Sequence, residues 1–172
     1  MKKLIIALLV LTPALFFAQS AFDKFDGKDN VTAVIVNKKM FELMGNVKMD
    51  PKDKEGLQYL NLIKKLDNLK VFTTQNGQVM AEMKSTVDSY LKKNPLEELM
   101  RINDSGRNIK IYVKSGATSS QVRELLMFME GGGKNESVLM SLTGNFDLSE
   151  ISVLTDKLNL PGGTELKKAS KK

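Results

Sequence analysis

Asn108-Ile109-Lys110-Ile111-Tyr112-Val113-Lys114 decides the fold, because apolar and polar residues alternate along this stretch. A period of two is typical of a strand with one buried and one solvated face, the usual arrangement in antiparallel sheets. The turn-forming triplet Asp104-Ser105-Gly106 separates it from the segment 96–103. The two segments therefore predict a β-hairpin.

A second hairpin is expected around Gly131-Gly132-Gly133. Its first arm, 121–130, fits a helix face as well as a buried strand. We favour the strand, because 136–143 alternates and supplies a partner across the glycines. The residues on one side of that partner are Val138, Met140 and Leu142.

The N-terminal half alternates between strand and helix patterns. The β-branched run 31–36 predicts a buried strand, and 69–74 predicts a second one. Between them lie a short helix at 38–44 and a helix that Asp50 caps and Pro51 starts. A strand, a helical connection and a further strand suggest a right-handed βαβ unit.

Two more helices complete the expected fold. One opens at Asn76-Gly77 and ends at Lys92-Lys93 before Pro95, and the last is capped by Asp147. The sequence thus predicts an α+β single domain. Its sheet is expected to be mixed but largely antiparallel, with an N-terminal βαβ unit and helices packed on one face.

The first twenty residues have the layout of a secretory signal peptide. Lys2-Lys3 precedes an uncharged apolar run at 4–17, and Ala18-Gln19-Ser20 places small residues before a cleavage site. A membrane-spanning helix needs about 20 apolar residues, so no anchor is expected after signal removal. We predict a signal peptide at 1–20, one domain at 21–160, a disordered lysine-rich tail at 161–172, and a soluble periplasmic or secreted protein.

Composition limits the chemistry that is open to the chain. It has no cysteine and no histidine. Disulfides, thiolate sites and a lipidated cysteine are excluded, and the side chain that normally titrates near neutrality is missing. No metal site or cofactor is predicted.

The net charge of +6 is concentrated at the two ends of the chain. Without Lys2 and Lys3 the charge is +4, and the tail carries +3 of it. The remaining body of about +1 has no basic face of the kind that binds nucleic acid. The tail is read as a solvated terminus, or otherwise as a weak contact with anionic lipid or polymer.

Several segments together resemble a known family. They are the strand followed by Lys39-Met40-Phe41, the segment 96–100, Ile109-Lys110-Ile111-Tyr112, and 142–148 with the helix after it. In these the chain resembles the exported bacterial family called domain of unknown function 4252. Many members of that family look like lipoproteins, which this cysteine-free chain does not. The resemblance implies no activity, so no functional residue is carried over.

Two patterns suggest alternatives to simple binding. Ser89 and Lys92 have the Ser-x-x-Lys spacing of penicillin-recognising hydrolases, but the companion motifs of that class do not occur. Methionine is frequent, and Met80, Met83, Met127 and Met129 are expected to line a cavity if the protein carries an apolar ligand. Thioethers also bind Cu(I), although methionine among aliphatic residues mostly fills cores.

The preferred hypothesis is a non-catalytic module that binds an envelope protein or polymer. Its expected contact surface is the sheet face opposite the helices, with Lys110, Tyr112 and Lys114 exposed there. An apolar-ligand carrier is the alternative, and a small hydrolase or copper protein is less favoured. The oligomeric state is left open.

Overall fold

The computed structural model describes residues 21–104, 106–118, 120–132 and 136–158, together with Thr164 and Lys167. The predicted signal peptide and the rest of the predicted tail lie outside the described residues. The described elements follow the expected order: η2 (Asp23–Phe25), β1 (Thr32–Asn37), α2 (Lys38–Gly45), α3 (Lys54–Ile63), β2 (Leu66–Thr74), α4 (Gly77–Lys93), β3 (Glu97–Asp104), β4 (Arg107–Ser115), β5 (Gln121–Gly132), β6 (Glu136–Asp147), η3 (Leu148–Glu150) and α5 (Ile151–Leu158).

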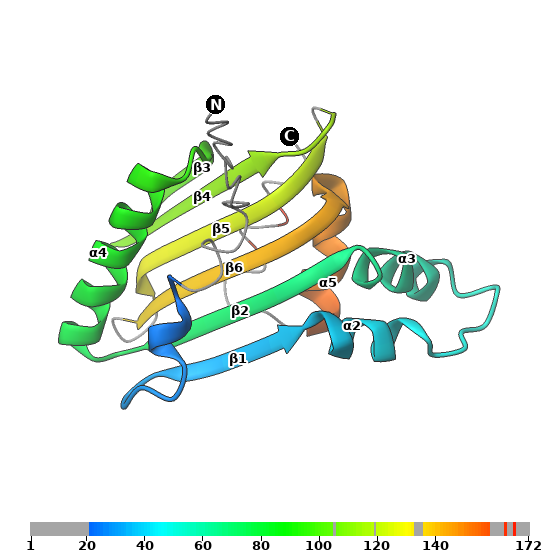
Figure 1. Ribbon diagram of the computed structural model, residues 1–172, viewed down its shortest axis with the longest axis horizontal. Coiled ribbons are helices and arrows are strands. Elements are labelled where there is room, and N and C mark those ends of the chain that lie inside the picture. The colour runs from blue at the N-terminus through cyan, green and yellow to red at the C-terminus, as the bar shows by residue number, and fades with distance from the viewer. Residues whose placement is uncertain are drawn as a thin grey trace, which may run out of the picture.

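The strands form one six-stranded sheet in the order β1-β2-β6-β5-β4-β3, and every neighbouring pair is antiparallel (Figure 1). Both predicted hairpins are confirmed, β3 with β4 and β5 with β6. The segment 121–130 is a strand, as favoured from its pairing partner. The α+β class and single domain are therefore confirmed.

The direction of the first two strands corrects the expected βαβ unit. A strand, two helices and a second strand do follow one another, but β1 and β2 are antiparallel, so the sheet is not mixed. α2 and α3 pack side by side beyond the end of β1 (Figure 1). The chain therefore turns back in this helical hairpin and enters β2 at the end where it left β1.

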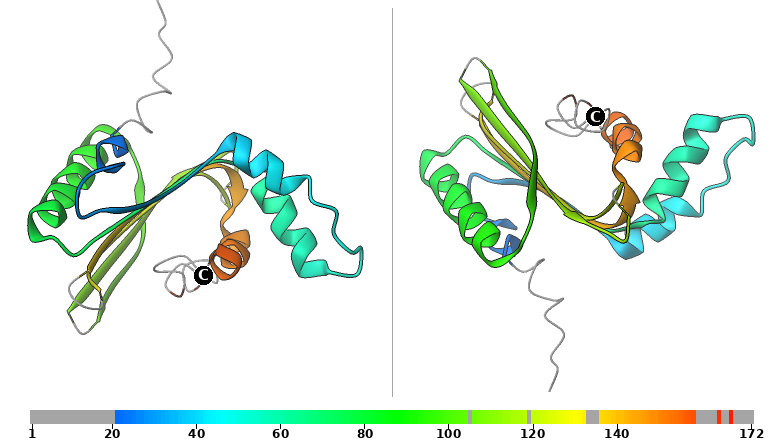
Figure 2. Two further views of the ribbon diagram at one scale, coloured as in Figure 1. Left: turned by 90° about the horizontal axis from the view of Figure 1, so that it is seen from below. Right: turned by 90° about the horizontal axis from the view of Figure 1, so that it is seen from above.

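Helices cover both faces of the sheet, which corrects the prediction of a single covered face (Figure 2). The central strand β5 explains why, since the consecutive side chains 124–129 are all buried. A strand that is apolar on both faces needs cover on both. A helix layer on one side would have left half of these residues in water.

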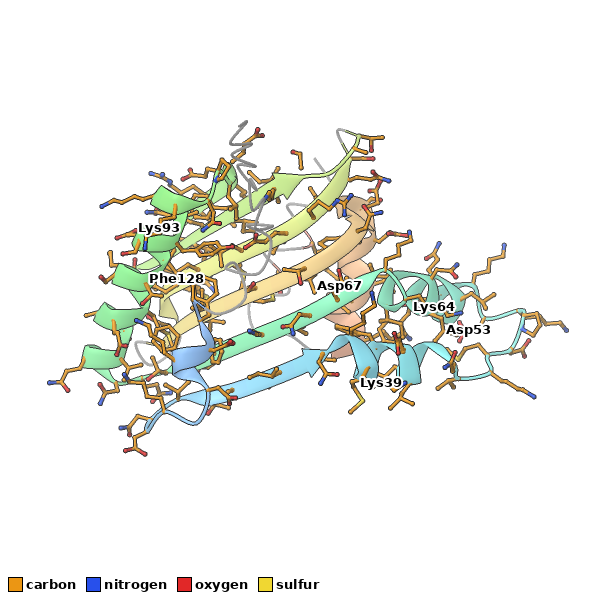
Figure 3. The ribbon with its side chains drawn as sticks, viewed as in Figure 1. Lys39, Asp53, Lys64, Asp67, Lys93 and Phe128 are labelled. Carbon is orange, nitrogen blue, oxygen red and sulfur yellow. The ribbon has the colours of Figure 1, made fainter. Side chains whose placement is uncertain are left out.

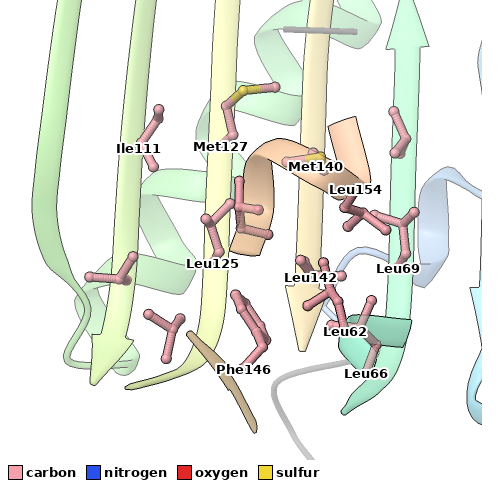
Figure 4. Close-up of a cluster of buried hydrophobic side chains, with 14 of the residues drawn as sticks. Leu62, Leu66, Leu69, Ile111, Leu125, Met127, Met140, Leu142, Phe146 and Leu154 are labelled. Carbon is pink, nitrogen blue, oxygen red and sulfur yellow. The ribbon is translucent and has the colours of Figure 1, made fainter. Parts of the chain in front are cut away.

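Two hydrophobic clusters result, one on each face. The α4-side cluster consists of Phe22, Phe25, Phe72, Val79, Met83, Val87, Tyr90, Leu126, Phe128 and Leu139. The α5-side cluster, part of which is drawn in Figure 4, consists of Phe41, Leu60, Leu62, Ile63, Leu66, Leu69, Val71, Ile109, Ile111, Val113, Val122, Leu125, Met127, Met129, Val138, Met140, Leu142, Phe146, Ile151 and Leu154.

Side-chain caps set where the helices begin. The Asn76 carboxamide accepts hydrogen bonds from the Gln78 and Val79 N–H groups at 3.0 and 3.1 Å, which fixes the start of α4. α3 is capped by Asp53, and the prediction of Asp50 is wrong. Asp50 instead accepts from the Lys52 N–H in the preceding turn, so the helix starts three residues later.

Asp147 begins the last helical segment, as predicted. Its carboxylate accepts from the Ser149 N–H at 2.9 Å, and the Glu150 carboxylate accepts from the Asp147 N–H at 3.0 Å. This reciprocal capping box lies in η3, which leads directly into α5. Within the described part of the chain, no helix has both the length and the apolar character required to cross a membrane.

Candidate functional site

β1 is an edge of the sheet, and its outer side has no strand partner among the described residues. On its inner side it pairs with β2 without a bulge, from Thr32 opposite Thr73 to Asn37 opposite Asn68. An edge strand presents a row of unpaired N–H and C=O groups, and such a row can pair with a strand from another chain. The backbone of β1 is therefore suited to strand addition.

The side chains of β1 favour the same use. Val34 is 49% exposed and Ile35 is 40% exposed. Val34 lies opposite Val71 and Ile35 lies opposite Lys70, so the two apolar side chains point to different faces of the sheet. Neither proline nor a charged residue occurs in the strand, which reads TAVIVN. β1 thus lacks the residues with which natural edge strands avoid pairing.

The other edge, β3, is protected. It contains Glu97, Glu98, Arg101 and Asp104, and a bulge between Glu98 and Met100 interrupts its pairing with β4. The Arg101 guanidinium donates to the Glu98 carboxylate at 3.0 and 2.6 Å and lowers the pKa of that carboxyl. Charges and bulges both discourage edge-to-edge pairing. Of the two edges, β1 is the one that lacks these protections.

Further large apolar side chains are exposed on α2, on α3 and between these helices. α2 starts directly after β1, because the Asn37 side chain accepts from the Met40 N–H at 3.0 Å and caps the helix. One face of α2 buries Phe41 in the α5-side cluster, while its outer face stays uncovered. We call the large apolar side chains that are exposed in the described residues the β1 edge patch; they lie on both faces of β1, on α2, on α3 and between these helices: Val34, Ile35, Met40, Leu43, Val47 and Leu57.

Sequence reasoning missed this surface. It predicted a buried strand at 31–36, and that prediction is wrong for Val34 and Ile35. An unbroken apolar run suits a central strand equally well, and strand order along the sheet is not written in the run itself. The run held no signal for the edge, because a strand without charged residues is typical of a buried, central position.

Lys110, Tyr112 and Lys114, which we call the Tyr112 strip, lie on the face that α4 covers. They pair with Phe128, Leu126 and Glu124 of β5, which point toward α4. Lys110 and Tyr112 are half-buried, and Lys114 is exposed. Burial raises the pKa of the Tyr112 hydroxyl, and Glu98 adds to this effect. The strip is thus polar sheet surface beside a helix, and the Tyr112 ring packs partly against the α4-side cluster.

The sheet separates the four candidate methionines. Met83 is buried in the α4-side cluster, and Met80 is half-buried on the same helix. Met129 and Met127, the second of which is labelled in Figure 4, belong to the α5-side cluster on the opposite face. These side chains therefore do not converge on one cavity, and three of them fill the cores.

Ser89 and Lys92 are both exposed on α4. A pocket of about 530 Å³ lies elsewhere, where β1, β2 and β6 meet the start of α4. The Thr74 hydroxyl at this pocket donates to the Asn30 carbonyl at 2.6 Å. All its lining residues but one are polar, and none was a candidate from the sequence: Asn30, Val31, Thr32, Thr73, Thr74, Gln75, Asn76 and Glu136.

A buried polar pair joins α4 to the sheet. The Tyr90 hydroxyl donates to Glu124 Oε1 at 2.7 Å, and Glu124 is 4% exposed. Burial raises the pKa of Glu124, while the hydrogen bond from Tyr90 opposes that rise. Burial and the neighbouring carboxylate also raise the pKa of Tyr90. Because the pair is closed off from solvent, it is a structural contact.

Comparison with known proteins agrees with the resemblance found in the sequence. A family model described as a domain of unknown function, DUF4252, matches residues 25–154. The match runs from η2 into α5 and therefore spans the whole sheet. Neither curated proteins nor solved structures yield a match. The chain belongs to the DUF4252 family, whose description assigns no function.

Proposed function

We propose that this chain is an exported, non-catalytic binding protein that holds an extended segment of a partner protein against β1. The observation that carries the proposal is the unpaired, uncharged and apolar edge of the sheet. In strand addition the main-chain hydrogen bonds provide affinity, and side chains on alternate faces provide selectivity. Val34 and Ile35 would supply one contact on each face.

The β1 edge patch supports this surface over the Tyr112 strip. Exposed apolar side chains that gather in one region mark interaction sites, because their removal from water drives association. Six such side chains are exposed on β1 and on the α2–α3 helical hairpin that follows it. In the Tyr112 strip, the one aromatic ring is half-buried and packed on the α4-side cluster.

Export is proposed from the first twenty residues, and it has a direct test. We expect the chain to be cleaved between Ser20 and Ala21, because small residues precede this bond. Intact-mass measurement of protein recovered from the periplasm or medium should give a chain that begins at Ala21. Recovery of the uncleaved chain from the cytoplasm would contradict the proposal.

Binding is tested by photo-crosslinking in cells that produce the protein. A photoreactive phenylalanine analogue in place of Val34 should give a covalent adduct with a protein partner, while the same analogue in place of Lys110 should not. The Ile35→Lys substitution should reduce the Val34 adduct at least about 10-fold, because a lysine would be desolvated at the contact.

Tyr112→Ala is the matched control. It removes the aromatic side chain of the Tyr112 strip and should leave the Val34 adduct unchanged. Thermal unfolding of each variant checks that the domain is intact. A partner that is lost with Tyr112→Ala and retained with Ile35→Lys would reject β1 as the site.

A further inference from the structure

We infer that the strand that pairs with β1 is β1 of a second copy of this chain. This inference rests on the proposed function, since both use the same edge. Two copies related by a two-fold axis perpendicular to the sheet would pair β1 antiparallel to itself. The result is one continuous sheet in which each face of one copy continues into the same face of the other.

The side chains of β1 are self-complementary in one register, with Val34 opposite Val34 of the second copy. Thr32 then lies opposite Val36, and these side chains continue the apolar rows of the α5 side. On the α4 side, Ile35 lies opposite Ala33 of the other copy. The small alanine leaves room for the isoleucine, and the pairing would cover both exposed side chains of each strand.

Charges flanking β1 favour the antiparallel arrangement. Lys38 and Lys39 follow the strand on α2, and Asp29 precedes it in a turn. Antiparallel pairing brings the end of one strand that Lys39 follows toward the end of the other strand that Asp29 precedes. Opposite charges that meet at an interface favour one orientation of the partners.

The ion pairs that these lysines form within one copy do not prevent Lys39 from approaching Asp29 of a second copy. Lys39 Nζ lies 3.5 Å from Glu42, and its side chain is 76% exposed. Lys38 Nζ lies 3.0 Å from Asp67, with both side chains more than half exposed. Exposed pairs of this kind contribute little to stability. Lys39 lies on α2 just past the end of β1, where a second copy would meet it (Figure 3).

The test is the self-association of the purified protein, measured by sedimentation at about 1 µM to 1 mM. We expect a monomer–dimer equilibrium in this range. Val34→Lys should weaken the dimer at least about 10-fold, because two lysines would then face each other in an apolar row. Val34 is half-exposed in the single chain, so this variant should still fold.

A charge swap makes the test specific for the second copy. Lys39→Asp and Asp29→Lys should each weaken the dimer about 3- to 10-fold, and the double variant should recover to within about 3-fold of the wild type. Lys93→Glu on α4, far from β1 in Figure 3, is the matched control and should have no effect. Amide hydrogen exchange should show β1 protection that decreases on dilution.

The possible outcomes separate this inference from the proposed function. A protein that stays monomeric up to 1 mM, or a dimer that Val34→Lys leaves unchanged, would overturn the inference. So would a charge-swapped double variant weaker than either single one. If the wild type is monomeric but the Val34 crosslink to another protein is lost with Ile35→Lys, the inference fails and strand binding at β1 stands.

Discussion

Replacement of Phe72 by alanine is expected to lower the free energy of unfolding by about 3–5 kcal/mol, the usual range for a buried phenylalanine. Phe72 has no exposed surface and lies in the α4-side cluster, with its ring centroid 5.8 Å from that of Phe25. Few atoms can move into the vacated space, because β2 pairs with strands on both sides. Chemical denaturation at constant pH measures the loss.

Phe72→Leu provides the control for this prediction. It keeps most of the apolar volume, so its expected cost is below about 1.5 kcal/mol. Phe72 also lies opposite Ala33 of β1 on the α4 side, so faster amide exchange in β1 should accompany the alanine variant. A loss below about 1 kcal/mol for Phe72→Ala would mean that the ring is not enclosed as the structure shows.

Replacement of Tyr90 by phenylalanine is expected to cost about 1–3 kcal/mol, because the buried Glu124 carboxyl loses the hydrogen bond that the Tyr90 hydroxyl donates. Burial raises the folded-state pKa of Glu124 above its ordinary value, so protonation of this carboxyl favours the folded state. Its contribution to the free energy of unfolding is therefore complete at acid pH. That contribution is lost as pH rises through the raised pKa. The hydrogen bond from Tyr90 opposes the rise in the Glu124 pKa, and it therefore limits the loss of stability at higher pH.

The pH dependence distinguishes this effect from simple loss of packing. In Tyr90→Phe the pKa of Glu124 should rise further, so the difference from wild type should be smaller below the raised pKa of Glu124, where the carboxyl is protonated in both proteins, than above it. Denaturation at several pH values measures it. Tyr59→Phe is the matched control, because burial is what raises the pKa of the Tyr59 hydroxyl, and its cost should be smaller and nearly independent of pH. A pH-independent loss in Tyr90→Phe would contradict the role given to Glu124.

Local signals in the sequence predicted most of the elements correctly. The alternation at 108–114 identified β4, and the partner supplied by 136–143 resolved 121–130 as a strand. Asn76 and Asp147 were recognised as starting points because capping depends on residues within one helical turn. The same locality explains the error at Asp50, since Asp53 offers an equivalent cap three residues later.

The sequence alone determined the α+β class, the two hairpins, the absence of thiol and imidazole chemistry, and the family resemblance, because each depends on neighbouring residues or on composition. Only the tertiary structure decided the direction of β1 relative to β2, the helix cover on both faces, and the place of β1 at the edge. These features depend on contacts between segments distant in sequence. An apolar strand such as TAVIVN can satisfy a central or an edge position, so the exposed edge that we propose for binding emerges only once all six strands are in order.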